Sequence, residues 1–259
     1  MAYILGFTFA DGNIYKTTLS WDIQIRDLNL LRKINKALDS TYPIVTTLRN
    51  SCRLRISNQM LIEGAIRRGL LPKKNMRKIF PNIPLRYKRH FIRGFLDGDG
   101  WIVNRTGRNE TDLGFVSSGI QFLEQLRGEV NNQLNIYGKI GQRNKITPKG
   151  VKSTTYTLNY FSSNAVLVTK WLFGNLNHND IYLGRKYLKY LEAEKMYASF
   201  LKMFNGKRRI QRENEKSIRD ILKDLYKDKK LNGMQITRIL KTSKSSVYRW
   251  LESTGVKYL

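Results

Sequence analysis

The chain has 259 residues, which is enough for one large domain or two medium ones with real hydrophobic cores. Its 47 Lys and Arg residues outnumber 20 Asp and Glu residues, and the resulting net charge of +27 favours a polyanionic partner. No apolar run approaches the roughly 20 residues that would cross a bilayer, and the single cysteine, Cys52, excludes an internal disulfide.

The predicted elements begin with an apolar helix that ends at Asp11-Gly12. A strand with alternating polar and apolar residues follows it, then an amphipathic helix, a hairpin and a further helix. These predicted elements lie near residues 19–26, 28–38, 46–57 and 58–69. The next stretch, residues 70–89, is rich in Pro, Lys and Arg, and it is predicted to be a linker laid over the surface.

The same order of elements then begins again with FIRGFLDGDG at residues 91–100. The predicted strands and helices that follow lie at 101–106, 112–117, 119–134, 138–144, 153–160 and 163–173. Each half therefore reads as helix, hairpin, helix, hairpin and helix. A long helix from about 182 to 201 closes the second half.

Small residues recur four positions apart in the first helix of each half. Gly6 and Ala10 form this pair in the first half, and Gly94 and Gly98 form it 88 residues later. Because residues four apart share one face of a helix, each pair predicts a stripe on which another backbone can approach closely. The obvious partner of each helix is the other helix. Two unrelated core helices are the alternative.

Asp11 and Asp99 fall in the last turn of these two helices, and Gly12 and Gly100 follow where a left-handed residue commonly ends a helix. If the helices pack in parallel, both carboxylates emerge together at the negative pole of both helix dipoles, where acids are disfavoured. No Lys or Arg adjoins either aspartate in the motif. A divalent metal is therefore the predicted neutraliser, and Mg²⁺ suits it because it prefers oxygen ligands.

The paired motifs resemble those of the LAGLIDADG homing endonucleases, in the single-chain form that carries both copies. The resemblance covers roughly residues 2–204. It implies an α+β fold of two pseudo-symmetric αββαββα repeats, whose sheets form a DNA-binding saddle. The expected domains are a first repeat at 1–73, a basic linker at 74–88, a second repeat at 89–204 and a small all-α extension at 205–259.

The resemblance also implies the chemistry. Asp11 and Asp99 would hold Mg²⁺, and the carbonyls of Ala10 and Gly98 would join the coordination. Mn²⁺ would substitute for Mg²⁺, whereas Ca²⁺ would support binding without cleavage. Both strands of a long, asymmetric duplex target would be hydrolysed across the minor groove, leaving short 3′ overhangs.

Lys74 and Lys186 match the positions of the family's active-site lysines, with Lys73 and Arg185 as the alternatives. Asp97 lies where the family name has its first aspartate. Two residues from Asp99 on a helix, it is expected to point to the opposite side, so a catalytic role is not favoured.

Polar residues of the predicted strands are the candidates for contact with DNA, because Arg and Gln can pair with base edges in the major groove. Each could equally hold a phosphate or be a solvated charge. The candidates are Gln24, Arg26, Arg53, Arg55, Asn104, Arg105, Lys139, Arg143 and Lys145.

The end of the chain, from Met234, resembles a helix-turn-helix of the resolvase type. Its second helix would present residues to a DNA major groove. These residues are Lys244, Ser245, Ser246, Tyr248 and Arg249. Thr237 and Lys241 depart from the pattern, which prefers alanine and glycine there. A plain helical hairpin is the alternative.

The sequence thus predicts a monomeric, intron-encoded DNA endonuclease with a C-terminal DNA-binding extension. A non-catalytic DNA-binding regulator and an intron maturase, which binds intron RNA, remain as rivals on the same fold. The expected setting is a reducing cell interior, either the cytoplasm of a bacterial or phage-infected cell or an organelle.

Overall fold

The computed structural model describes residues 1–73, 76–146, 152–177 and 179–256, without the side chains of residues 145, 152, 200, 202–205 and 212. The chain divides into two compact units, Met1–Glu194 and Lys195–Leu259. Each unit has a hydrophobic core of its own.

The first repeat has the predicted order of elements. They are α1 (Ala2–Asp11), β1 (Gly12–Tyr15), β2 (Thr18–Gln24), α2 (Leu28–Ala37), β3 (Ile44–Thr47), β4 (Ser51–Ser57) and α3 (Gln59–Arg67). The second repeat has the same order. Its elements are α4 (Leu85–Asp99), β5 (Gly100–Arg105), β6 (Glu110–Ser117), α5 (Ile120–Leu134), β7 (Lys139–Ile146), β8 (Lys152–Phe161) and α6 (Ser162–Phe173). The predicted α+β fold of two αββαββα repeats is confirmed. A long helix, α7 (Gly184–Asn214), follows them.

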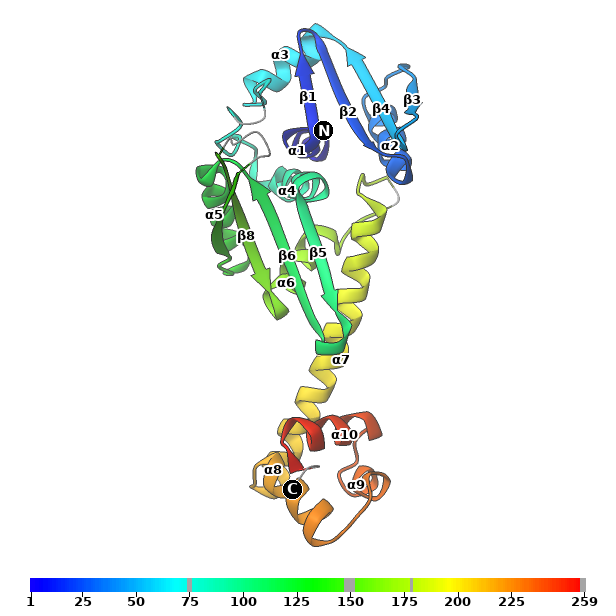
Figure 1. The fold of residues 1–259 in the computed structure, drawn as a ribbon, viewed down its shortest axis with the longest axis vertical. Helices are drawn as coiled ribbons and strands as arrows, with labels where there is room; N and C mark the ends of the chain where they lie inside the picture. Colours follow the sequence, from blue (N-terminus) through cyan, green and yellow to red (C-terminus); the bar gives the residue numbers. More distant parts are fainter. Residues whose placement is uncertain (74–75, 147–151, 178, 257–259) are drawn as a thin grey trace. The chain divides into compact units, whose positions relative to one another are not determined.

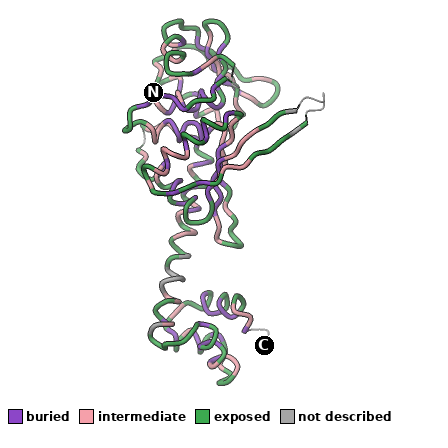
Figure 2. Tube along the Cα trace, turned by 90° about the vertical axis from the view of Figure 1, so that its left-hand side faces the viewer, coloured by how far each residue is buried: buried purple, intermediate pink, exposed green. Residues whose placement is uncertain are grey.

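Each repeat builds one antiparallel sheet of four strands, in the orders β1-β2-β4-β3 and β5-β6-β8-β7. Trp21 of β2 pairs with Gly12 on one side and Leu54 on the other. Strand alternation sends Trp21 and Leu54 into the core and leaves a polar outer face. Figure 1 looks onto the strands and shows α1 and α4 lying between the two sheets. In Figure 2, the exposed arms of β7 and β8 extend away from the rest of the first unit.

Helices α1 and α4 pack against each other through their glycines. A Cβ atom at Gly6 would overlap the carbonyl oxygen of Phe91, and one at Gly94 would overlap the carbonyl oxygen of Tyr3. Phe91 and Gly94 follow Tyr3 and Gly6 by the same 88 positions, so a pseudo-twofold axis relates the two contacts. The helices run in parallel and approach too closely for a side chain at either glycine.

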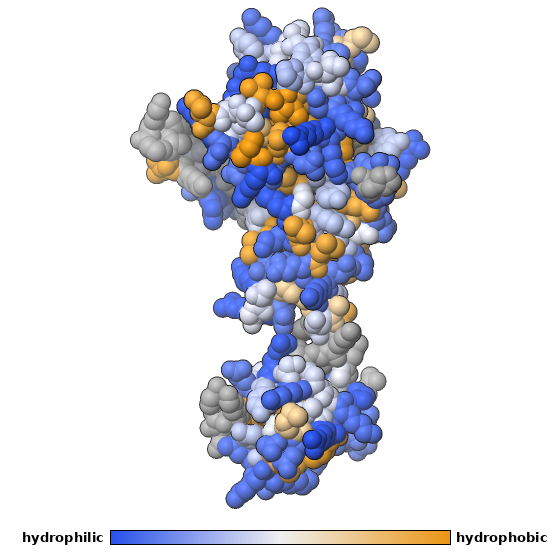
Figure 3. Space-filling model, turned by 90° about the vertical axis from the view of Figure 1, so that its right-hand side faces the viewer, coloured by the Kyte–Doolittle hydropathy of each residue, from blue (hydrophilic) through white to orange (hydrophobic). Residues whose placement is uncertain are grey.

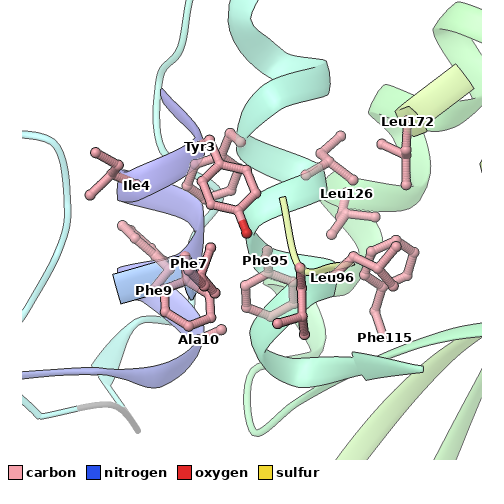
Figure 4. Packing of buried hydrophobic residues seen from close by; sticks show 14 of the residues in the cluster. Tyr3, Ile4, Phe7, Phe9, Ala10, Phe95, Leu96, Phe115, Leu126 and Leu172 are labelled. Carbon is pink, nitrogen blue, oxygen red and sulfur yellow. The ribbon is translucent and has the colours of Figure 1, made fainter. Parts of the chain in front are cut away.

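Aromatic rings fill the space around this contact and join the repeats into one core. Phe9 of α1 meets Phe91 of α4 edge to face, with ring centroids 5.3 Å apart. Phe95 of α4 lies 4.6 Å from Phe122 of α5 by the same measure. Figure 4 shows the α1 residues of this core beside Phe95 of α4.

The left-handed conformation predicted for Gly12 and Gly100 is wrong. Both are extended, with φ −79° and −138°, and both begin the next strand. Space requires glycine here instead, because a Cβ atom would overlap the side chain of Thr8 at Gly12 and that of Leu96 at Gly100.

The segment between the repeats does not lie on the surface as predicted. Leu70, Phe80 and Ile83 are buried in the core, and Arg77 is only 5% exposed. The backbone N–H of Phe80 donates to the side chain of Gln125 on α5 at 2.7 Å. This part of the chain therefore closes the core that the two repeats share.

The second unit is all-helical, as predicted. Its helices after α7 are α8 (Ile218–Leu222), which continues into a π-helical turn at Lys223–Asp228, then α9 (Gly233–Ile239) and α10 (Lys244–Ser253). Leu222, Ile236, Val247 and Leu251 lie in its core. Within the described parts of the chain, no helix is both long enough and apolar enough to span a membrane.

We expect Gly6→Ala or Gly94→Ala to destabilise the first unit by at least about 3 kcal/mol, because the added methyl group meets backbone that no rotamer change can move. Thermal unfolding followed by circular dichroism measures this. Gly128→Ala is the matched control, since its Cβ on α5 would meet nothing within 4 Å. It should stabilise the unit by about 0.5–1 kcal/mol. Equal transitions for Gly6→Ala and wild type would contradict the close helix contact.

Lys241 has a φ of 45°, in the left-handed region that favours glycine. We therefore expect Lys241→Gly to stabilise the second unit by about 0.5–1 kcal/mol. Gly255 has a φ of +72°, so Gly255→Ala should destabilise the same unit by a similar amount. Urea denaturation with hydrogen-exchange detection in residues 206–256 measures both, and a loss of stability in Lys241→Gly would refute the conformational reason.

Candidate active site

The parallel packing of α1 and α4 brings Asp11 and Asp99 to the same end of the helix pair. Asp11 ends α1 and is exposed, while Asp99 ends α4 and is half-buried. A Cβ atom at Gly98 would overlap the Cβ of Ala10 and would lie 3.2 Å from Oδ2 of Asp11. The carboxylate of Asp11 therefore lies against the residue that precedes Asp99, as the parallel packing predicts.

Arg77 closes the C-terminal end of α1. Its guanidinium donates to the carbonyl oxygens of Thr8 at 2.8 Å, Phe9 at 3.1 Å and Gly12 at 2.9 Å. Its Nε also donates to the carbonyl of Leu71 at 2.7 Å. Carbonyls in the last turn of a helix have no partner within the helix, so a buried cation satisfies them and opposes the negative pole of the dipole.

Lys186 closes the C-terminal end of α4 in the same way. Its Nζ donates to the carbonyl oxygens of Leu96, Asp97 at 2.9 Å and Gly100 at 2.7 Å. These acceptors are the Arg77 acceptors shifted by the 88 positions that separate the two motifs. Arg77 and Lys186 are thus structural counterparts, although they come from different parts of the two repeats.

Burial sets the electrostatics of these two cations. It lowers the pKa of Lys186 to about 8, while Asp97, Asp11 and Asp99 act in the opposite direction. It also lowers the pKa of Arg77 to about 10, opposed by Asp99. Both groups remain largely protonated at neutral pH, so two positive charges stand beside the two carboxylates.

Asp97 belongs to the packing between the repeats. It is 2% exposed, and its Oδ2 accepts from the hydroxyl of Tyr3 and from the backbone N–H of Leu183, each at 2.7 Å. Burial raises the pKa of Asp97 to about 6, while Lys186, Tyr3 and Leu183 act against that rise. This buried position agrees with the prediction that it points away from the face of Asp99.

Comparison with known proteins gives a family. Residues 86–193 match the model of the LAGLIDADG-like domain. The chain thus carries a LAGLIDADG-like domain in its second repeat. The matched segment contains α4 and Asp99. The other copy of the motif lies in α1, outside the matched segment. No curated protein matches the sequence.

The solved structures to which this chain is similar include three of the same family name. The N-terminal LAGLIDADG domain of DUF199/WhiA is 14% identical, with 68% of this chain and 82% of that chain covered and a TM-score of 0.44. The I-LtrWI LAGLIDADG homing endonuclease bound to target DNA is 12% identical over 78% and 90%, with a TM-score of 0.48. The I-SmaMI LAGLIDADG homing endonuclease bound to cleaved DNA is 12% identical over 75% and 87%, with a TM-score of 0.47.

Besides Lys186, three basic residues were predicted near the two aspartates at the ends of α1 and α4. Lys74 lies outside the described residues. Arg185 is held by Asp27 at 3.2 Å, and Lys73 is exposed. The sequence did not single out Arg77 as a residue of the site. It lies in the basic run KKNMRK, where composition cannot distinguish one buried cation from its solvated neighbours.

Most candidates for DNA contact lie on the outer faces of the sheets. Gln24, Arg53 and Arg55 share the outer face of β2 and β4, and Arg53 pairs there with Asp22. Lys139 and Arg143 are exposed along β7, and the side chain of Lys145 is not described. Arg26, in the short 3₁₀ turn Ile25–Asp27, is exposed as well.

The two adjacent candidates on β5 point to opposite faces. Asn104 shares the inner face of Ile102, and its amide donates to the carbonyl of Lys189 at 2.8 Å and to Glu192 at 2.7 Å. In this structure its amide is directed at α7 and not at the outer face of the sheet. Arg105 faces outward and pairs with Asp112 at 2.6 Å.

One predicted contact residue in the second unit lies in the interior. Ser246 is buried at 9% exposure, and its hydroxyl lies 2.8 Å from that of Ser243. Lys244, Ser245, Tyr248 and Arg249 are exposed along α10, as predicted.

We expect Lys186→Met to destabilise the first unit by about 2–4 kcal/mol, because three carbonyls at the end of α4 lose their donor. Urea denaturation measures the change. Lys189→Met is the matched control, since that half-exposed lysine only pairs with Glu192 along the same helix, and it should change stability by less than about 0.5 kcal/mol. Equal effects of the two substitutions would show that the carbonyl contacts contribute little.

Proposed function

We propose that the chain is a site-specific endonuclease that hydrolyses one phosphodiester in each strand of duplex DNA with a divalent metal. The observation that carries this proposal is the meeting of the two helix ends, where the carboxylate of Asp11 lies against Gly98, next to Asp99. Each of the two related halves supplies one acid to the same place. This arrangement suits a reaction that must occur twice, once on each strand.

The residues at this point fit a hard divalent cation. Asp11 and Asp99 would hold it, together with the carbonyls of Ala10 and Gly98, which are not among the six helix-end carbonyls to which Arg77 and Lys186 donate. Oxygen donors of this kind suit Mg²⁺, with Mn²⁺ as a substitute and Ca²⁺ supporting binding alone. Among the described residues no third acidic or His ligand joins them, which leaves room for water and phosphate oxygens. When bound, such an ion polarises a phosphate and lowers the pKa of its water.

Arg77 and Lys186 act here as positioning residues. Each fixes the backbone that carries one acid, through the carbonyls of residues on both sides of it. Each also offsets the negative pole of a LAGLIDADG helix, which would otherwise repel a phosphate. Lys186, which matches the position of a family active-site lysine, is thus proposed to act indirectly, since its three donors are all directed at carbonyls.

The outer faces of the two sheets would hold the DNA. Gln24, Arg55, Lys139 and Arg143 are exposed there, and Arg26 is exposed in the 3₁₀ turn that follows β2. All five suit contact with base edges or phosphates. Because the two repeats carry different side chains at equivalent strand positions, the target is expected to be long and asymmetric. We propose a monomer that cuts across the minor groove, leaves short 3′ overhangs and serves intron homing.

We expect Asp11→Asn or Asp99→Asn to reduce double-strand cleavage by at least about 100-fold, because loss of a metal ligand removes several kcal/mol of transition-state stabilisation. The substrate is a supercoiled plasmid that carries a duplex selected by binding from a random pool in Ca²⁺. Linear and nicked plasmid are quantified after Mg²⁺ is added. Asp39→Asn is the matched control, because Asp39 is exposed at a φ of 50° that asparagine tolerates, and it should cut like wild type.

Cleavage that survives both substitutions at the LAGLIDADG helix ends would exclude these acids as ligands. Tight binding by wild type without any cleavage in Mg²⁺ or Mn²⁺ would favour a non-catalytic DNA-binding regulator. Binding and stimulated splicing of a host intron RNA would favour a maturase.

A further inference from the structure

A cavity of about 890 Å³ lies in the first unit, at the N-terminal ends of α1 and α4. Residues 1–5 form one wall, α3 forms another, and α4 contributes its residues between Pro84 and Arg93. The first turn of α1 is about 14 Å from Asp11 along the helix axis, so this cavity is separate from the candidate active site. Its volume falls within the range of small-molecule sites, about 300–1,000 Å³.

Most of the cavity lining is apolar. Ile4 and Leu5 of α1 face Met60, Leu61 and Ala65 of α3 across it. Figure 3 shows that hydrophilic residues cover most of the visible surface of the chain, so an apolar cavity departs from the general character of this surface. Apolar surface left in water is unfavourable, and a ligand with an apolar body would cover it.

A buried cation in the cavity wall has an unused donor. Arg93 is 1% exposed, and its terminal nitrogens donate to the carbonyls of Leu172 at 3.2 Å and Ile181 at 3.3 Å and pair with Asp180 at 3.3 Å. Its Nε has no hydrogen-bond partner among the described residues. A buried donor without a partner costs free energy, so an acceptor bound in the cavity would satisfy it.

The start of α1 adds further donors at the same place. The N–H groups of a first helical turn have no partner within the helix, Met1 provides no side-chain cap, and the first turn of α1 contains no acidic residue. The guanidinium of Arg93 lies over the ring of Tyr3 in this turn, 5.5 Å from the ring centroid. The positive end of the α1 dipole and a buried cation are therefore neighbours.

The charges around the cavity favour an anion. Arg68 and Arg93 line it, and Asp180, the one acidic residue among the described residues of the lining, is already paired with Arg93. Burial lowers the pKa of His90 in the same wall, and Arg93 and Arg89 lower it further, against the opposite effect of Asp180. A bound anion would be stabilised here, whereas a bound cation would be repelled.

We propose that this cavity binds a small organic anion with an apolar body, of the class of fatty acids and aromatic carboxylates. The apolar body lies between α1, α3 and α4. The anionic head accepts from the first-turn N–H groups of α1 and from Nε of Arg93. This inference does not require that the chain cleaves DNA.

The test uses the full chain, with decanoate as the probe and isothermal titration calorimetry as the measurement. Salt at about 0.15 M screens binding to the basic surface. Wild type is expected to bind decanoate at one saturable site. 1-Decanol keeps the apolar body and lacks the charge, so it should bind at least about tenfold more weakly. Decylammonium should not bind at this site.

Gly64→Leu is expected to block the cavity. Gly64 lines it on α3, and an added Cβ atom would meet only the side chain of Arg68, at 3.8 Å. The leucine would therefore occupy the cavity without displacing the backbone, and it should weaken decanoate binding at least about tenfold because the apolar body loses its place. Gly128→Leu is the matched control, since its Cβ on α5 would meet nothing within 4 Å; it should bind like wild type.

Ala2→Glu tests the position of the anionic head. An acid in the first turn of α1 stabilises the helix, but it occupies the N–H groups and repels a second anion. It should weaken decanoate binding at least about tenfold and leave 1-decanol binding unchanged. Ala2→Gln is the isosteric control and should retain decanoate. Unchanged thermal unfolding in each variant confirms that the fold is kept.

The proposal is overturned if decanoate shows no saturable site, if Gly64→Leu binds it as tightly as wild type, or if 1-decanol binds as tightly as decanoate. Equal losses in Ala2→Glu and Ala2→Gln would likewise overturn the assignment of an anionic head to the start of α1. Decanoate binding with no plasmid cleavage in Mg²⁺ would refute the endonuclease and leave this site in place.

Discussion

The backbone contact between α1 and α4 is the constraint on which the rest of the first unit depends. Gly6 and Gly94 let two parallel helices approach at van der Waals distance, and a parallel pair must end at one place. That place collects two negative dipole ends and two carboxylates, an arrangement that is unfavourable without positive charge. Arg77 and Lys186 supply this charge from within the protein. Core packing and the candidate site are therefore consequences of the same contact.

The two buried cations are equivalent in their acceptors and different in chemistry. Arg77 also donates to the carbonyl oxygens of Leu71 and Pro72, so it fixes the segment in which it lies. Lys186 has three donors, and all of them are used at the end of α4. An arginine is held in a planar fork, whereas a lysine is a compact charge whose pKa responds more readily to burial. The backbone around Asp11 is therefore fixed by a planar guanidinium and the backbone around Asp99 by a single ammonium group, although the carbonyls involved are equivalent.

Local patterns in the sequence were sufficient for the elements of the fold and for the two acids. Helical and strand periodicities depend on near neighbours, and the repeated Gly and Asp spacing fixed the pairing of α1 with α4. The errors concern residues whose surroundings are set from far along the chain. Arg77 is recognised as a helix-end donor only from its contacts with carbonyls that lie more than 60 positions away in the sequence. Asn104 and Arg105 are adjacent on one strand and cannot share a face, and only the burial of Ile102 shows which of them points inward.

The 20 acidic residues of the chain cannot pair with all of its 47 basic residues. Here the buried cations rely on backbone carbonyls. Arg77 and Lys186 bind helix ends, and Arg93 donates to the carbonyls of Leu172 and Ile181 in addition to its ion pair with Asp180. Main-chain acceptors add no acidic residue, so the excess positive charge remains on the surface. Self-repulsion of that surface weakens the compact state and is relieved when a polyanion binds. The composition therefore links the folding of this chain to its proposed DNA-binding role: the interior satisfies its cations without neutralising the surface that DNA is proposed to contact.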